Sequence, residues 1–252
     1  MKKKNKKINA AILIIGNEIL SGRTQDNNVA FISKWLNSEC GINVSEVRII
    51  PDKEKIIKEN IILLSKKFDY VFTTGGIGPT HDDITAQSIS KAFKIKYEFH
   101  KEAYSILENY YGKKDFNDGR KKMARMPKGA KLIYNPSSAA PGFIIKNVFS
   151  LPGVPSILKS MIDNCKRYLN NGLKIFSKTI NLYTVESNIS KKLGDIQNKY
   201  KKQVDIGSYP FFRLGKIGVS IVSRSTSRSY LNKVEKDLTN LAFKKKIKIF
   251  KI

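Results

Sequence analysis

The sequence predicts an α/β protein in which a domain with a mainly parallel sheet is followed by a small α+β module. Short apolar runs alternate with amphipathic segments of about ten to fifteen residues, the order of parallel strands joined by crossover helices. Two of the apolar runs lead into glycine-bearing turns, near residues 75 and 153. A polar turn at residues 170–172 precedes a different order of elements. We therefore expect two domains, residues 1–172 and 173–252.

The first domain opens with an apolar run at residues 8–15, typical of a strand covered on both faces. An amphipathic helix follows from Asp26 and ends at Gly41. Further strands are expected at residues 44–50, 69–74, 94–99, 131–134 and 143–151, and further helices at residues 56–64, 84–93, 101–112, 117–126 and 156–169. One face of the helix at 101–112 should be formed by Ala103, Ile106, Leu107 and Tyr110.

The second domain is expected to have the order β-α-β-β-α, which suits a small layer of helices on a sheet. Its strands are predicted at residues 177–185, 204–209 and 216–223, and its helices at residues 190–200 and 230–243. We find no catalytic constellation in this part of the sequence. The chemistry is therefore expected in the first domain.

The segment from Asp69 to Asp83, DYVFTTGGIGPTHDD, carries the strongest functional signal. A buried strand runs into Gly75, Gly76 and Gly78, whose backbone N–H groups can approach a ligand closely. The next helix begins beside them, and a helix N-terminus favours an anion. The simpler alternative is a tight turn with a helix cap. Three glycines, a proline and two acids within a few residues favour a phosphate-binding loop, to which we also assign Thr80.

Four acids follow three of the predicted strands. Glu18 follows the first strand, Asp52 the second, and Asp82 and Asp83 the third. Since the ligand site of a parallel sheet lies beyond the carboxyl ends of its strands, we expect all four on one edge. Asp82 and Asp83 could either cap the following helix or hold a divalent cation against phosphate oxygens. His81 is expected to be a solvated loop residue rather than a general base, and His100 to be structural.

Two later segments are expected to complete the same site. The connection at 135–142, NPSSAAPG, has the small side chains of a loop that lies close over a ligand, although a simple hairpin turn would look similar. Pro152-Gly-Val-Pro155 is a second glycine-bearing junction between a strand and a helix. We assign Ser138, Gly142 and Gly153 as ligand-binding residues.

The composition limits the choice of partners. The formal charge of +26 favours anionic ligands, but only eight of the 47 basic residues are Arg and the lysines are scattered, so nucleic acid is not the expected partner. Cys40 and Cys165 show no metal-binding or disulfide spacing. No apolar run approaches the roughly 20 residues that span a bilayer. A cytoplasmic protein without membrane contact is expected.

Five motifs in order resemble the MoaB/Mog family, most closely the N-terminal part of its CinA type. They cover about the first 170 residues: GNEILSG at 16–22, PD at 51–52, TGGIGPTHDDIT at 74–85, NP with APG within 135–142, and LPGVP at 151–155. The resemblance implies a three-layer α/β/α fold and a homo-oligomer, either a dimer or a trimer. It also implies that Asp52 and Asp83 serve metal-dependent nucleotidyl chemistry, and that Gly75 to Gly78 cradle the ligand. CinA-type relatives carry a small module similar to residues 174–243.

The function that the resemblance implies is a metal-dependent pyrophosphatase of dinucleotides such as ADP-ribose or FAD. Asp52, Asp82 and Asp83 would be catalytic, and Glu18, Asp82 and Asp83 would hold Mg²⁺, Mn²⁺ or Co²⁺. The alternatives are molybdopterin binding or adenylyl transfer, and a nucleotide- or pterin-binding protein without turnover.

The chain departs from the family pattern in two motifs and in its length. Ser138-Ala139 stands where relatives often have Gly-Thr, and Asn27-Asn28 where they have Thr-Asn. The amidohydrolase domain of full-length CinA proteins does not follow, so we do not expect its activity here.

Overall fold

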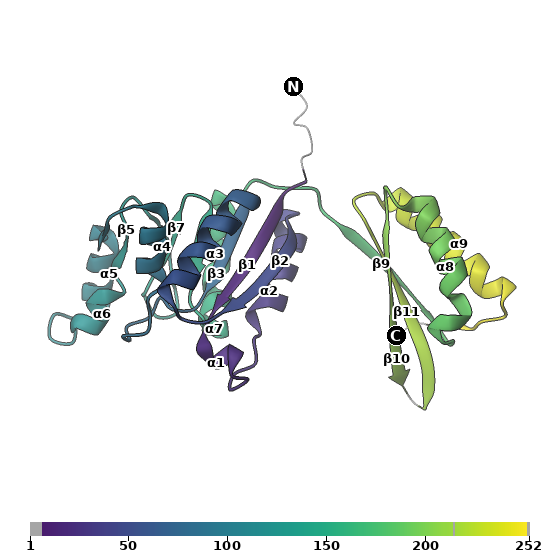
Figure 1. Ribbon diagram of the computed structural model, residues 1–252, viewed down its shortest axis with the longest axis horizontal. Coiled ribbons are helices and arrows are strands. Elements are labelled where there is room, and N and C mark those ends of the chain that lie inside the picture. Colours follow the sequence, from purple (N-terminus) through teal and green to yellow (C-terminus); the bar gives the residue numbers. More distant parts are fainter. Residues whose placement is uncertain (1–6, 214, 251–252) are drawn as a thin grey trace, which may run out of the picture. The chain divides into compact units, whose positions relative to one another are not determined.

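Six strands of the computed structural model form the central sheet of the first domain (Figure 1). The structure describes residues 7–213 and 215–250. The chain divides into two compact units, Met1–Gly172 and Leu173–Ile252, and each is described here by itself.

The sheet of the first unit has the strand order β2-β1-β3-β8-β7-β6. β2, β1, β3 and β8 are parallel neighbours, β7 runs antiparallel to β8, and β6 antiparallel to β7. The strands span Asn9–Ile15 (β1), Asn43–Ile50 (β2), Tyr70–Thr74 (β3), Lys131–Ile133 (β6), Gly142–Ile145 (β7) and Val148–Leu151 (β8). The expected mainly parallel sheet is therefore confirmed.

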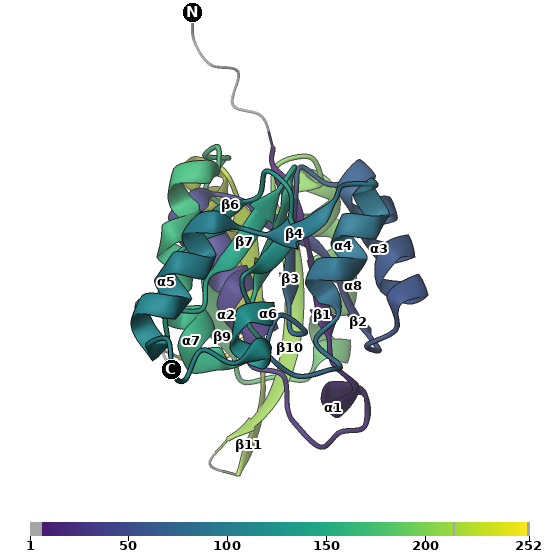
Figure 2. The same cartoon turned by 90° about the vertical axis from the view of Figure 1, so that its left-hand side faces the viewer.

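Helices cover both faces of this sheet and make the three layers. Alternate residues of β1 divide between the layers: Leu13 belongs to the core with α3 and α4, whereas Ile12 belongs to the core with α2 and α7. Figure 2 shows α3 and α4 on one side of the sheet and α2 on the other. The helices span Asn17–Leu20 (α1), Asn28–Trp35 (α2), Glu54–Lys67 (α3), Thr85–Phe93 (α4), Lys101–Tyr111 (α5), Asp118–Lys122 (α6) and Pro155–Met161 (α7).

Two predicted elements of this unit were wrong, one because of a local strand pairing and one because of a distant pairing. The apolar run at 143–151 is not one strand but the hairpin of β7 and β8, which turns at Lys146 with a positive φ of 53°. The helix expected over 117–126 ends early, since Arg125–Pro127 (β5) pairs with Tyr97–Phe99 (β4). Neither pairing leaves a signal in local periodicity.

Smaller differences concern helix ends and faces. The helix expected from 156 to 169 becomes 3₁₀ at Ile162–Tyr168 (η2), and α2 continues as a π-type turn at Leu36–Cys40 (η1) until Gly41. Tyr110, expected on the buried face of α5, is 57% exposed and packs edge-to-face against Tyr111. His100 caps α5, because its Nδ1 accepts a hydrogen bond from the N–H of Ala103.

The second unit is a four-stranded antiparallel sheet with two helices. Its strand order is β10-β11-β9-β12. The elements span Phe176–Leu182 (β9), Glu186–Tyr200 (α8), Asp205–Arg213 (β10), Lys216–Ser225 (β11), Arg228–Lys244 (α9) and Ile249–Phe250 (β12). Its own core includes Ile221 of β11 and Leu238 of α9. The order expected from the sequence is confirmed, and β12 is an addition.

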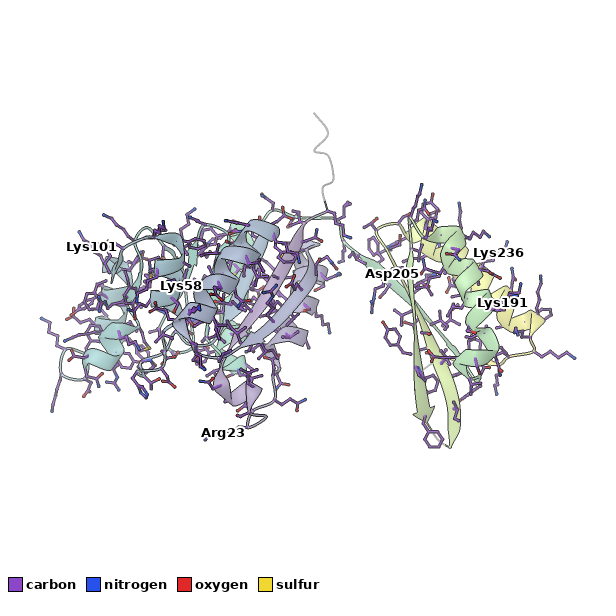
Figure 3. All side chains as sticks on the ribbon, viewed as in Figure 1. Arg23, Lys58, Lys101, Lys191, Asp205 and Lys236 are labelled. Carbon is purple, nitrogen blue, oxygen red and sulfur yellow. The ribbon has the colours of Figure 1, made fainter. Side chains whose placement is uncertain are left out.

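Charged side chains project into solvent over both units, as Lys58, Lys101, Lys191 and Lys236 do in Figure 3. Within the described residues, every helix is too short or too polar to cross a bilayer.

Candidate functional site

The carboxyl ends of β1, β3 and β8 meet at one edge of the sheet. The N–H of Gly75, directly after β3, donates to the carbonyl of Leu151 at the end of β8, with an N···O distance of 3.1 Å. A Cβ on Gly75 would lie 2.1 Å from the carbonyl oxygen of Ile15, so only glycine fits between the neighbouring strands. A Cβ on Gly153 would lie 3.4 Å from the Cα of Gly75. The two glycine-bearing junctions predicted from the sequence therefore adjoin each other.

Thr85 holds the first glycine loop against the start of α4. Its Oγ1 donates to the carbonyl of Gly75 over 3.0 Å, and its N–H donates to the carbonyl of Gly76 over 2.9 Å. Gly76 has a φ of +66°, and a Cβ there would meet Thr85 Oγ1 at 2.2 Å. Thr85 belongs to the motif at 74–85, but its side chain has no signal of this role in the sequence.

A cavity of about 540 Å³ opens beyond this edge. Seven of the predicted site residues line it: Glu18, Gly75, Gly76, Gly78, Asp83, Ser138 and Gly153. Four others, Asp52, Thr80, Asp82 and Gly142, are outside the lining. Gly142 begins β7, where a Cβ would lie 2.4 Å from the carbonyl oxygen of Ser150, so its size is required by the packing of the sheet.

Thr80 contacts both acids of the glycine loop. Its Oγ1 lies 2.6 Å from Oδ1 of Asp82 and 2.6 Å from Oδ2 of Asp83, and its N–H donates to Asp83 Oδ2 over 2.8 Å. The Thr80 hydroxyl lowers the pKa of the exposed Asp82 carboxyl. The residue before α4 is Ile84, and neither acid caps the helix. These contacts position Asp83 at the cavity.

Asp52 joins the acidic edge from the side of β2. Its Oδ2 accepts a hydrogen bond from the N–H of Asn17 over 2.8 Å, at the start of the α1 turn that carries Glu18. Burial raises the pKa of Asp52 despite that hydrogen bond, and the negative charges of Glu18 and Asp82 raise it further. The acids that follow β1, β2 and β3 thus lie close enough to repel one another.

The acids suit a hard cation in chemistry but form no ready-made ligand shell. Glu18 and Asp83 both line the cavity. Among residues 7–213 and 215–250, however, no three His, Cys, Asp or Glu side chains are grouped tightly enough to hold a metal. Mg²⁺ is commonly bound by one or two carboxylates together with water and substrate phosphates, and two cavity carboxylates fit that pattern.

Asn135 organises the loop that covers the cavity. This buried side chain accepts hydrogen bonds from the N–H groups of Ser137 and Ser138, and its Nδ2 donates to Ser138 Oγ and to the carbonyl of Ala140. The loop also joins β6 and β7, which pair at Ile133 and Gly142. The connection is therefore a hairpin and a cavity wall at once. The NP motif at 135–136 was visible in the sequence, but the role of the Asn135 side chain was not.

Two more residues were missed because they act across the chain. Asn28 is only 5% exposed, and its Nδ2 donates to the carbonyl of Gly153 over 2.8 Å. Lys122 donates through Nζ to the carbonyl of Thr80. A small neighbouring cavity shares Gly76, Gly78 and Asp83 with the first and is also lined by Lys122 and Arg125. Positive charge is thereby placed beside the glycine loop.

Two family models match the chain in succession. Residues 11–171 match the family described as "Probable molybdopterin binding domain". Residues 174–250 match "FAD synthase, middle domain". The two matches together indicate a nucleotide-related function.

Proteins of archaea and bacteria are among those similar to this chain. A protein of Archaeoglobus fulgidus is 34% identical over 199 residues, which cover 79% of this chain and 84% of that protein. A "CinA-like protein" of Prochlorococcus marinus is 32% identical over 86% of this chain, which spans 52% of the relative's length. The crystal structure of "the protein CinA with unknown function" from Thermoplasma acidophilum superposes with a TM-score of 0.60 and 31% identity. It covers 64% of this chain and 98% of that one. This chain therefore belongs to the MoaB/Mog-like molybdopterin-binding domain family, in its CinA type.

Proposed function

We propose that this protein is a metal-dependent pyrophosphatase that cleaves the phosphoanhydride of a dinucleotide such as ADP-ribose or FAD. The observation that carries the proposal is one cavity lined both by the carboxylates of Glu18 and Asp83 and by two adjoining glycine junctions. Its volume of about 540 Å³ is within the range of roughly 300–1,000 Å³ typical of small-molecule sites.

The phosphate oxygens would be bound by backbone amides. Gly75 is not a donor for the ligand, since its N–H is bonded to Leu151. The N–H groups of Gly76 and Gly78 donate to no other group in the described part of the chain, and both glycines line the cavity. The N-terminus of α4 adds its dipole to this side. Lys122 would neutralise part of the negative charge of the diphosphate.

The acids would complete the site beside the glycine loop. A bound Mg²⁺, Mn²⁺ or Co²⁺ would offset the charge that develops on the phosphoanhydride and orient the attacking water. Glu18 and Asp83 would hold this ion, with Asp82 adding negative charge nearby. Asp52 would position the α1 turn through the Asn17 amide and strengthen the attraction for a cation.

The test is a chromatographic assay of AMP release from ADP-ribose and from FAD, with and without each of the three cations. We expect AMP only in the presence of a divalent cation. Tight binding of both compounds without turnover would instead support a nucleotide-binding protein that lacks catalysis.

Molybdopterin adenylyl transfer is the second candidate, favoured by the family match over residues 11–171. That reaction consumes ATP and releases pyrophosphate, so incubation with ATP and molybdopterin distinguishes it from hydrolysis. We also propose a homodimer or homotrimer, to be measured by light scattering.

A further inference from the structure

A second cavity, of about 380 Å³, lies at the opposite edge of the first unit's sheet. Tyr70 begins β3, Lys131 begins β6, and Lys146 lies in the turn between β7 and β8, all at the edge where the parallel strands start. None of the residues that line this cavity lines the cavity with the glycine loops. It is a separate feature, and its residues carry no part of the proposed function.

Three cations surround this cavity and no carboxylate lines it. Lys131, Lys146 and Arg167 belong to separate segments of the chain, and none of them forms an ion pair with another described residue. Lys131 Nζ and Arg167 Cζ lie 5.5 and 4.8 Å from the centroid of one ring, that of Tyr168. Both cations thus lie beside the same ring, and their charges favour an anion there.

The floor of this cavity is apolar and aromatic. Ile144 and Phe149 are buried, and Tyr70 meets Phe149 edge-to-face with the ring centroids 5.8 Å apart. The Tyr70 hydroxyl accepts a hydrogen bond from the N–H of Asn170 over 2.9 Å, which holds the ring in place. Tyr168 forms a further wall. The Phe149 ring is covered by Phe72, which stacks on it with the ring centroids 4.8 Å apart, whereas Tyr70 and Tyr168 are partly exposed and can stack with a planar group.

Lys146 is held in an unusual backbone conformation. Its φ of 53° belongs to the left-handed region, which a non-glycine residue seldom adopts. Its Nζ lies 4.3 Å from the centroid of the Phe93 ring. A glycine or asparagine would suit this turn better, so the lysine carries some backbone strain.

We propose that this cavity is a second ligand site, for a nucleoside monophosphate. The phosphate would bind between Arg167 and Lys131, where the guanidinium can contact two oxygens at once, and Lys146 would leave the Phe93 ring to join them. The base would stack on the aromatic wall. A volume of about 380 Å³ suits one mononucleotide better than the dinucleotide proposed for the larger cavity.

Lysine acetylation followed by mass spectrometry tests the proposal on the intact chain, with AMP, adenosine and inorganic phosphate as the probes. AMP at ten times its Kd should slow acetylation of Lys131 and Lys146 about tenfold, because only the free form reacts. Adenosine or phosphate at the same concentration should protect far less. Lys55 and Lys101, both exposed and outside the lining of this cavity, are the internal references. Protection of Lys122 reports separately on the glycine loops.

A double variant, Lys131→Gln with Arg167→Gln, locates the binding groups. Protection of Lys146 should require about 10- to 100-fold more AMP, since two charged contacts are lost. AMP release from ADP-ribose should be unchanged. The matched control is Lys55→Gln with Lys101→Gln, which should leave both the protection of Lys146 by AMP and the release of AMP from ADP-ribose unaltered. Equal protection by phosphate and AMP, or no protection at Lys146, would overturn the proposal whatever happens at Lys122.

Discussion

The two edges of the first unit's sheet differ in sign of charge and in chemistry. At the edge where β1, β3 and β8 end, glycines expose backbone amides and Glu18, Asp52, Asp82 and Asp83 gather despite mutual repulsion. At the edge where β3 and β6 start, Lys131 and its two cationic neighbours surround aromatic rings. One sheet thus presents an acidic, amide-lined cavity and a basic, aromatic one. The formal charge of +26 of the whole chain therefore does not describe the local charge at either site.

The contrast has a structural reason. Crossover helices begin beside the carboxyl ends of parallel strands, so helix N-termini and unpaired amides gather at that edge and suit phosphate. Carboxylates at that edge can bind a phosphate group only through a cation that lies between the two. The opposite edge has no such supply of amides, and an anion there must be bound by side-chain cations.

The largest expected effect distinguishes the two edges directly. Asp83→Asn should lower metal-dependent AMP release about 10²- to 10³-fold, because a carboxylate at the reacting phosphate is lost. The amide oxygen of asparagine can still accept the hydrogen bond from the Thr80 N–H, so the melting temperature should change little. The control is Lys131→Gln with Arg167→Gln, which should keep full turnover. A variant that unfolds would make Asp83 a structural residue instead.

Asn135→Ala tests the loop that covers the acidic cavity. Removal of this buried amide leaves the N–H groups of Ser137 and Ser138 without their acceptor, which should cost about 1–3 kcal/mol in the free energy of unfolding. KM for ADP-ribose should rise in parallel. Asn164→Ala, which removes one hydrogen bond to the Tyr134 carbonyl, is the matched control and should have the smaller effect on both. Urea denaturation measures the free energy of unfolding of both variants, and initial rates give their KM.

Gly153→Ala places one methyl group beside the first glycine loop. The new Cβ would lie 3.4 Å from the Cα of Gly75, an ordinary contact, so stability should be kept. The methyl would occupy space beside the phosphates, and KM should rise about tenfold, as for one added methyl in a tight pocket. Gly194→Ala in α8, where nothing lies within 4 Å, should leave KM unchanged. An unaltered KM for Gly153→Ala would remove this junction from the site.

The smallest expected effect is on stability against pH. The raised pKa means that folded Asp52 holds its proton to a higher pH than unfolded Asp52 does. The Asp52 carboxyl therefore contributes fully to stability at a pH below its pKa in the unfolded chain. This contribution is lost as the pH rises through its pKa in the folded protein. Asp52→Asn should therefore raise the melting temperature slightly at pH 7, and the gain should vanish below about pH 4. A gain that is independent of pH would contradict the raised pKa of Asp52, which burial and the charges of Glu18 and Asp82 cause.

Much of the fold could be predicted because its signals are local. The apolar runs of β1 and β3 and the helical period of Ile57, Ile61 and Leu64 appear directly in the sequence, and these residues are buried as expected except Tyr70, which is partly exposed. The larger cavity lies at the edge of the sheet where the glycine motif follows β3. The pairing of β4 with β5 escaped prediction, since it joins residues about thirty positions apart with no local period.

The sequence by itself determined the order of strands and helices, the glycine-rich turns and the acids that follow the strands, because these depend on periodicity and on residue type at a turn. Only the tertiary structure decided which groups meet. Asn28 reaches Gly153 across 125 positions, and Lys131, Lys146 and Arg167 come together from three segments that share no motif. The reason is physical: backbone preferences act between near neighbours, whereas the walls of a cavity are made by side chains that packing brings together from anywhere in the chain.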